Sequence, residues 1–338
     1  MKVGSLFSGY GGLDLAVEAV LGATPAWHSE VDPHASKLLA AHWPGVPNLG
    51  DITAIDWSEV EPVDVICGGF PCQDISSAGR GAGIKEGTRS GLWYRYADAV
   101  RILRPGLVFV ENVGALVVRG LDIVVGDLAA IGYDAEWACV RASDVGAPHR
   151  RERLFLLAWP AADADHVGRQ HAGLRAGSRA VAGGGGLTPA GATDIGHQRP
   201  GGARGWWAGS ADGSHVAADA DCGRRLHGAG VSAGHNGPGL RGGAAEHCLL
   251  ATRWGPYAEA IHRWERILGR PAPAPTDERG RLAPAFPEWM MGLPEGWVTG
   301  HGLTRSAELK AIGNGVCPQQ GAAALRLLLE RSALAVAS

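Results

Sequence analysis

Short apolar runs alternate with longer amphipathic segments along the first 158 residues. The runs at residues 3–7, 26–30, 63–67, 107–110 and 154–158 have the length and composition of buried strands. Between them, apolar residues recur at helical spacing in segments 13–21 and 93–103. This rhythm predicts an α/β fold, with a doubly wound, mostly parallel sheet covered by helices on both faces. Ligands of such sheets bind at the carboxyl ends of the strands, so the residues that follow the strands are the first candidates for a functional site.

The pattern changes after about residue 160. Residues 161–243 hold 22 of the 52 glycines and no lysine, and they show little hydrophobic periodicity. This composition is typical of a flexible insertion or linker. Apolar residues return at helical spacing in segment 254–270, and the chain closes with a glycine-containing turn followed by an apolar helix from about residue 318.

Composition narrows the class of protein. A chain of 338 residues with 46% hydrophobic residues is expected to form one large globular domain and a smaller one. No apolar run reaches the roughly 18 residues that span a bilayer, and the first residues lack the apolar core of a signal peptide. Six cysteines without regular spacing indicate the reducing cytoplasm. A net charge of −3 means that any nucleic-acid surface must be local.

Glycines and acidic residues follow the first strands. The segment 9–12 places three glycines between the first strand and the first helix, where backbone N–H groups approach a ligand. Asp14 occupies the third glycine position of the dinucleotide fingerprint, which disfavours a nicotinamide oxidoreductase. Glu30 ends the second strand, and Asp51 is expected to end a third. Together they predict a nucleoside pocket whose acidic floor suits a cationic cofactor such as S-adenosylmethionine.

Cys72 stands directly after a proline at the end of a predicted strand, in the sequence GGFPCQ. A free cysteine is often a buried structural thiol. Here a polar loop follows, with Arg80, Lys85 and Arg89, whose positive charge favours the thiolate. Cys72 is therefore predicted to be a nucleophile. The other cysteines, which are predicted to be small core or loop residues, are Cys67, Cys139, Cys222, Cys248 and Cys317. Neither a C-x-x-C pair nor ligand spacing among the histidines supports a metal site.

A glutamate and an arginine pair complete the candidate chemistry. Glu111 follows a buried strand, where partial desolvation raises the pKa of a carboxyl and allows it to donate a proton near neutral pH. The alternative is a helix cap or a salt-bridge partner. Arg151 and Arg153 are spaced by two residues, so they lie on the same side of an entering strand. Taken alone, such a pair is more often a solvated face.

The order of eight segments along the chain resembles that of the cytosine-C5 DNA methyltransferases. These segments are FSGYGG, the strand end at Glu30, GDI at 50–52, GGFPCQ, SGLW, ENV, HRRER and GNGV. The segment FPEWMMGLPEGW is similar to the phage and prophage branch of that family. The resemblance implies a Rossmann-like S-adenosylmethionine-dependent fold. It assigns residues 1–158 and 284–338 to a catalytic, cofactor-binding domain, on which the C-terminal helix packs. It assigns residues 159–283 to a smaller target-recognition region, Gly-rich and flexible from about 165 to 243.

The resemblance also implies a mechanism. The thiolate of Cys72 attacks C6 of a flipped-out cytosine, and Glu111 hydrogen-bonds or protonates N3. Arg153 holds the cytosine O2, Arg151 steadies the catalytic loop or a phosphate, and the loop 73–90 closes over the base. C5 then takes the methyl group of S-adenosylmethionine. The residues that the resemblance assigns to the cofactor are Phe7, Gly9, Tyr10, Gly11, Gly12, Glu30, Asp51, Ile52, Pro71, Leu92, Asn314 and Val316. In one departure from the family pattern, His149 stands where a glutamine is usual.

The sequence thus predicts a DNA (cytosine-5-)-methyltransferase of the cytoplasm that acts as a monomer on double-stranded DNA, without a membrane association. A cognate restriction endonuclease is a potential partner. Two alternatives stay open: the same chemistry on tRNA, and a catalytically inactive DNA-binding relative.

Overall fold

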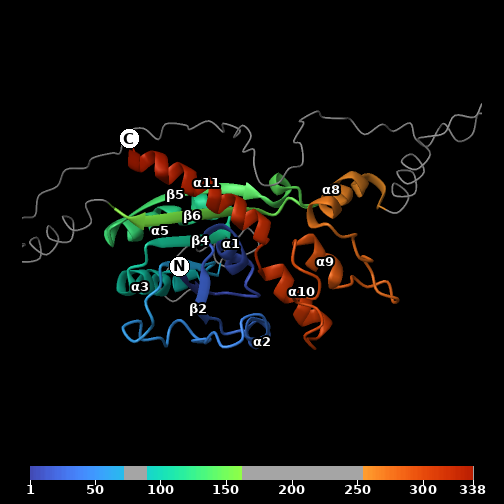
Figure 1. Ribbon diagram of the computed structural model, residues 1–338, viewed down its shortest axis with the longest axis horizontal. Coiled ribbons are helices and arrows are strands. Elements are labelled where there is room, and N and C mark those ends of the chain that lie inside the picture. Colours follow the sequence, from blue (N-terminus) through green and yellow to red (C-terminus); the bar gives the residue numbers. More distant parts are fainter. Residues whose placement is uncertain (72–89, 162–253, 338) are drawn as a thin grey trace, which may run out of the picture.

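A computed structural model describes residues 1–71, 90–161 and 254–337 (Figure 1). Within these residues one six-stranded sheet has the order β2-β1-β3-β4-β6-β5. Strands β1 to β4 pair in parallel, and β6 runs antiparallel to both of its neighbours. The strands are β1 (Lys2–Leu6), β2 (Thr24–Ser29), β3 (Val65–Gly68), β4 (Leu107–Val113), β5 (Tyr133–Arg141) and β6 (Glu152–Pro160).

Helices cover both faces of this sheet, which confirms the doubly wound α/β prediction. On one face, α3 and α5 pack against the inward side chains of β3, β4 and β6. On the other face, α1 and α11 pack together, and Figure 1 shows α11 crossing β5 and β6. The helices are α1 (Gly12–Leu21), α2 (Pro33–His42), α3 (Trp93–Leu103), α4 (Leu116–Arg119), α5 (Leu121–Ala130), α8 (Ala258–Leu268), α9 (Ala285–Met290), α10 (Arg305–Asn314) and α11 (Pro318–Ala337), with 3-10 turns η1 (Ser90–Leu92), η2 (Ala142–Val145) and η3 (Gly255–Tyr257).

Two elements differ from the sequence-based expectation. The edge strand β5 was not predicted, because its core-facing residues alternate irregularly with polar ones along YDAEWACVR. Asp51 does not end a strand: the chain before it forms only a single bridge, between Asn48 and His28, so the expectation of a third strand end at this position is wrong. Both segments lie at the margins of the sheet, where few side chains need to be buried and the apolar pattern is weak.

The cysteines that the structure describes differ in their exposure to solvent. Cys67 on β3 and Cys317 before α11 are buried, and burial raises the pKa of both thiols, that of Cys317 to about 11. They are core residues, as predicted. Cys139 is exposed on β5, which corrects the expectation of a core or loop position. Cys222 and Cys248 lie outside the described residues, as does Cys72.

A third group of buried side chains joins the C-terminal helices to the end of the sheet. It contains Trp264 of α8, Trp289 of α9 and Tyr10 from the glycine-rich turn after β1. The Trp264 indole also donates a hydrogen bond of 2.9 Å to the carbonyl oxygen of Trp289. The helices α8 and α9 lie on opposite sides of the predicted boundary at residues 283/284, yet they share this core. The division of the chain into a catalytic domain and a target-recognition region stays a prediction. In the described part of the chain, no helix has the length and apolarity that a membrane span requires.

Candidate active site

The chain leaves β3 toward Cys72 through a short, tightly held segment. Phe70 is 2% exposed and its ring packs on that of Trp93, with the centroids 5.4 Å apart. The side chain of Asn112, buried on β4, donates a hydrogen bond of 3.1 Å to the carbonyl oxygen of Phe70. The helix α3 and the strand β4 therefore fix the backbone immediately before Pro71, which is half-buried. Cys72 and residues 73–89 of its predicted loop lie outside the described residues.

Glu111 and Arg153 form an ion pair beside this segment. Arg153 Nε lies 2.9 Å from Glu111 Oε1, and the two side chains are 19% and 12% exposed. The antiparallel register of β4 and β6 brings them together, because Val113 is the partner of Arg153 and Glu111 lies two residues earlier on the same side. Burial raises the pKa of the Glu111 carboxyl, although the charges of Arg153 and Arg151 oppose this change. The arrangement offers one carboxyl that can hold a proton and one guanidinium that stays charged.

Gly69 leaves the space that the Glu111 carboxyl occupies. A Cβ at this position would stand 2.7 Å from Glu111 Oε2 and 3.2 Å from the Glu111 carbonyl oxygen, closer than real Cβ contacts. The glycine therefore lets the Cys72-bearing segment and the Glu111 carboxyl come into contact.

We expect Gly69→Ala to lower any activity that uses Glu111 at least tenfold, because the new methyl group displaces the carboxyl from Arg153. The matched control is Gly106→Ala, where a Cβ would have its nearest neighbour, the Asp64 carbonyl oxygen, at 3.4 Å. Rates and thermal unfolding midpoints of both variants check this expectation. Equal rates for the two variants would contradict it.

Arg151 binds the backbone at the end of α10 and directly after it. Its Nη2 donates to the carbonyl oxygens of Gly313, at 3.1 Å, and of Gly315. Its backbone φ of +22° is unusual for a residue with a side chain. The structure thus places this predicted site residue on the backbone of the predicted cofactor wall, two residues from Arg153.

The glycine-rich turn after β1 meets Glu30 at the carboxyl edge of the sheet. The Gly9 N–H donates to Glu30 Oε2 at 2.8 Å, and the other carboxylate oxygen accepts from the Asp32 N–H at 2.8 Å. Gly9 has a φ of +58°, and among the described residues no atom other than those of its chain neighbours stands within 4 Å of where its Cβ would be. Phe7, with a φ of +54°, turns the chain at the end of β1. This edge combines open space with an oriented carboxylate.

Tyr10 packs against the segment 313–316, which comprises the end of α10 and the first residues after it. It is fully buried, its hydroxyl donates to the Val316 carbonyl oxygen at 2.7 Å, and burial raises the pKa of its phenol. A Cβ on Gly315 would stand 1.9 Å from the Tyr10 ring, and one on Gly12 would stand 2.3 Å from the Val316 oxygen. The two glycines permit this close packing. The structure therefore brings the first and last motifs of the resemblance into direct contact.

The remaining predicted cofactor residues border this edge differently. Asp51 is exposed, and hydrogen bonds from the backbone and hydroxyl of Thr53 hold the pKa of its carboxyl below the usual value. Ile52 is 4% exposed, Leu92 packs partly against the core, and Asn314 is exposed at the end of α10.

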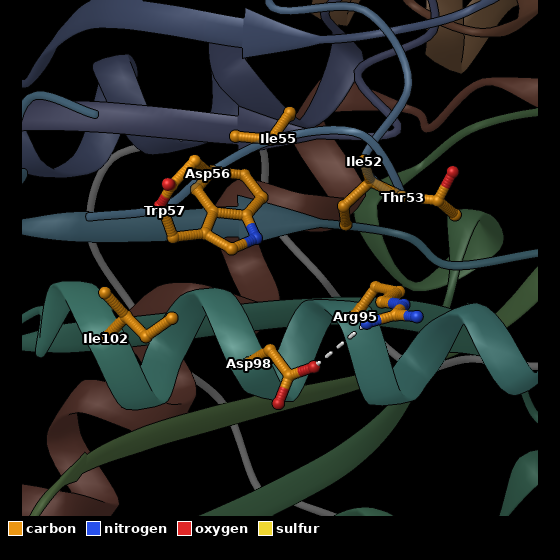
Figure 2. Close-up of a pocket in the computed structure, with 8 residues that line it drawn as sticks. All are labelled: Ile52, Thr53, Ile55, Asp56, Trp57, Arg95, Asp98 and Ile102. Atoms are coloured by element: carbon orange, nitrogen blue, oxygen red, sulfur yellow. Dashed lines mark ion pairs between the residues drawn. The ribbon is translucent and has the colours of Figure 1, made fainter. Parts of the chain in front are cut away.

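A pocket of about 280 Å³, lined in part by Ile52, lies between the loop 52–57 and α3 (Figure 2). Its other lining residues are Thr53, Ile55, Asp56, Trp57, Arg95, Asp98 and Ile102, and an Arg95–Asp98 ion pair of 3.6 Å lies beside it. Of the predicted site residues, only Ile52 lines this pocket, so the pocket is separate from the Glu111 site.

Three contacts of the site were missed from the sequence. Asn112 holds the Phe70 carbonyl, Gln320 binds the backbone of Arg151, and the ring Nε2 of His149 lies 3.0 Å from the carbonyl oxygen of Met290. Desolvation lowers the pKa of His149, so a neutral ring that donates from Nε2 fits this contact. Asn112 and His149 carried a sequence signal, since they stand in the ENV and HRRER segments, and Gln320 carried none. Among the described residues, no group of three or more His, Cys, Asp or Glu side chains has the arrangement of a metal site.

A glycine-rich turn with an acidic partner, at the carboxyl edge of a doubly wound sheet, defines the class of nucleoside-binding α/β proteins. Within that class, residues 1–168 match the family model described as C-5 cytosine-specific DNA methylase. This part of the chain belongs to that family, which confirms the predicted resemblance.

Named relatives agree with this assignment. The type II methyltransferase M.NgoBI of Neisseria gonorrhoeae is 35% identical over 160 residues, covering 46% of this chain and 50% of that protein. The type II methyltransferase M2.BsuMI of Bacillus subtilis (strain 168) is 37% identical over 166 residues, covering 47% and 42%. The chain spans about half the length, or less, of these curated relatives.

Among the solved structures that match, one is similar to the chain over nearly its full length. It is an E. coli protein assigned as a DNA modification methyltransferase encoded within a prophage, with a TM-score of 0.52 and 19% sequence identity, and the match covers 98% of this chain and 99% of that one. At this identity the likeness supports the Rossmann-like fold and nothing further about function.

Proposed function

We propose that the protein is a DNA (cytosine-5-)-methyltransferase that transfers a methyl group from S-adenosylmethionine to C5 of a flipped-out cytosine in double-stranded DNA. The observation that carries this proposal is the Glu111–Arg153 ion pair beside the backbone that leads into Cys72. The family match of residues 1–168 and the named type II methyltransferases support the same chemistry.

The residues at the carboxyl edge fit the proposed cofactor. Members of this family use S-adenosylmethionine as the methyl donor. The open space beside Gly9 and the Glu30 carboxylate, which retains lone pairs beyond its two backbone donors, suit a ribose with two hydroxyls. The exposed Asp51 carboxylate and the buried Ile52 suit the polar edge and the face of an adenine. When bound, the cofactor supplies an activated methyl group attached to a positively charged sulfur.

The protein side chains prepare the cytosine for this transfer. The Cys72 thiolate forms a bond to C6, and the electron pair of the C5=C6 bond becomes available at C5. Glu111 donates its proton, or a strong hydrogen bond, to N3 and so stabilises the resulting enamine. After C5 accepts the methyl group, a base removes the C5 proton. The Cys72–C6 bond then breaks, the C5=C6 double bond forms again, and any proton that N3 received returns to Glu111.

Arg153 has two roles in this proposal. Its guanidinium fixes the Glu111 carboxyl through Nε and donates from Nη1 to the Glu152 carbonyl oxygen at 2.8 Å, and the same group is assigned to the cytosine O2. Because C5 and C6 cannot be reached inside a duplex, the base must leave the stack, at a cost of a few kcal/mol. We further propose that the protein works as a monomer in the cytoplasm, and that a restriction endonuclease of the same specificity accompanies it.

Sequencing of methylated cytosines in plasmid DNA from cells that express the full chain tests this proposal. We expect 5-methylcytosine at one recurring short motif, and none in cells that express Cys72→Ala. A soluble protein that binds S-adenosylmethionine but leaves DNA unmethylated would contradict the proposal. Parallel assays on tRNA and on DNA binding alone then decide between the two alternatives.

A further inference from the structure

Gln320, in the first turn of α11, is fully buried and bridges two backbone segments. Its amide nitrogen donates to the Val140 carbonyl oxygen at 2.7 Å and to the Arg151 carbonyl oxygen at 2.8 Å. Val140 belongs to β5, and Arg151 directly precedes β6. The amide oxygen of Gln320 has no hydrogen-bond partner among the described residues. An unpaired buried oxygen is costly, so the two donated bonds are the function of this side chain in the fold.

The contact to Arg151 falls where the backbone is strained. Arg151 has a φ of +22°, a conformation that residues with side chains rarely adopt and that persists only when its surroundings enforce it. Gln320 holds the carbonyl group on one side of this residue. The guanidinium on the other side binds the carbonyl oxygens of Gly313 and Gly315. Both ends of Arg151 are thus fixed by residues near the start of α11.

Arg153 follows two residues later and carries the site chemistry of the proposed function. Its side chain contacts Glu111 from the second position of the strand β6. A change in the backbone conformation at Arg151 would therefore move the Arg153 backbone relative to Glu111. The segment that Arg151 binds also packs on Tyr10 of the glycine-rich turn. Arg151 therefore links the part of the site proposed to bind cytosine with the part proposed to bind the cofactor.

We propose that Gln320 is a positioning residue for the methyl-transfer reaction. It holds the Arg151 backbone in the conformation that places the Arg151 guanidinium on the segment 313–316 and the Arg153 guanidinium on Glu111. The expected effect on methyl transfer rests on the proposed function. The expected effect on the Arg151 backbone rests on the contacts alone.

The experiment compares Gln320→Met with Gln319→Met in the full chain. The first change keeps the size of the side chain and removes both donated bonds. The neighbouring Gln319 makes one bond of the same kind, to the Gly292 carbonyl oxygen at 2.7 Å, without contact to Arg151. We expect Gln320→Met to lower kcat for DNA methylation at least tenfold and Gln319→Met to leave it within twofold. A kcat within twofold of the wild type for a folded Gln320→Met variant overturns the proposal.

A double-mutant cycle separates positioning from general destabilisation. Arg151→Lys keeps the charge but cannot bridge both glycine carbonyls as the guanidinium does. If Gln320 acts through Arg151, adding Gln320→Met to Arg151→Lys lowers kcat by less than threefold further. If the double variant lowers kcat by the product of the two single effects, Gln320 and Arg151 act independently and the proposal is overturned. Should Gln320→Met fail to fold, Gln320→Asn takes its place in both experiments, with the same criteria.

A readout without substrate distinguishes this inference from the proposed function. Hydrogen exchange of the backbone amides at residues 313–316, in the protein alone, is expected to accelerate at least tenfold in Gln320→Met and less than threefold in Gln319→Met. Acceleration in a protein that methylates no DNA means that the coupling holds and the proposed function is wrong. Unchanged exchange in the folded Gln320→Met variant means that the coupling is wrong, whatever the activity.

Discussion

Glu111→Gln is expected to lower kcat for DNA cytosine methylation by about 10²- to 10⁴-fold, the range typical of a lost general acid. Glutamine has nearly the same size and can still donate a weak hydrogen bond to N3, but it cannot deliver a proton. The Arg153 guanidinium then also loses its anionic partner at 2.9 Å. The matched control is Glu136→Gln on the edge strand β5, for which we expect a kcat within twofold of the wild type. Rates measured at saturating DNA and S-adenosylmethionine check both values.

The pH dependence of the same reaction has a definite sign. Burial raises the pKa of Glu111 above that of an ordinary glutamate, so the protonated form persists to higher pH in the folded protein. Activity that needs this proton is present below the raised pKa and is lost as the pH rises through it. We therefore expect kcat to fall on the alkaline side of a profile from about pH 5 to 9, and Glu111→Gln to lack that fall. An identical alkaline limb in both proteins would assign the titration to another group.

Glu288→Gln is expected to lower the free energy of unfolding by about 3 kcal/mol, since charge-assisted hydrogen bonds contribute about 1.5–3 kcal/mol each. The buried Glu288 carboxylate accepts from the N–H groups of Gly296, Val298 and Thr299 and from the Thr299 hydroxyl. A glutamine would turn its NH₂ group toward these donors and leave at least one of them unsatisfied. The midpoint of urea unfolding measures the loss.

The control for this change stands in the same loop. Glu295 is exposed, and Glu295→Gln should change stability by no more than about 0.5 kcal/mol. The loop also holds Trp297, whose indole donates to the Tyr10 carbonyl oxygen at 2.9 Å. We therefore expect Glu288→Gln to weaken S-adenosylmethionine binding as well as stability. A folded Glu288→Gln variant as stable as Glu295→Gln would show that the four bonds are replaced.

The central strands and the paired site residues could be predicted from the sequence because burial on both faces leaves a strong apolar signal. The strand β3 is buried at every position, and β4 places Glu111 directly after three buried residues. The helix α2 also has a signal in the sequence, with Asp32 as a side-chain cap and Pro33 in the first turn. The edge strand β5 has no such pattern, and its partner β6 lies later in the sequence.

The contacts that organise the site are the part that the sequence does not reveal. Arg151 and the carbonyl oxygens that it binds are separated by more than 160 residues, and backbone acceptors have no identity in a sequence. The motif pattern marked Arg151 and Gly315 separately, but nothing in their spacing joins them. The same holds for His149 and the Met290 carbonyl. Only the fold decides which residues meet.

The hydrogen bond from Tyr10 to Val316 has a consequence for how the protein matures. It joins residues 306 positions apart, so the turn that contains Tyr10 is covered by a segment that the ribosome adds 306 residues later. At about 5–20 residues per second, roughly 15–60 s separate the two events. Contacts this distant along the chain also form slowly, because closing the loop costs entropy before any packing is gained. A nascent chain can therefore assemble its early strands well before it has a finished pocket for the methyl donor.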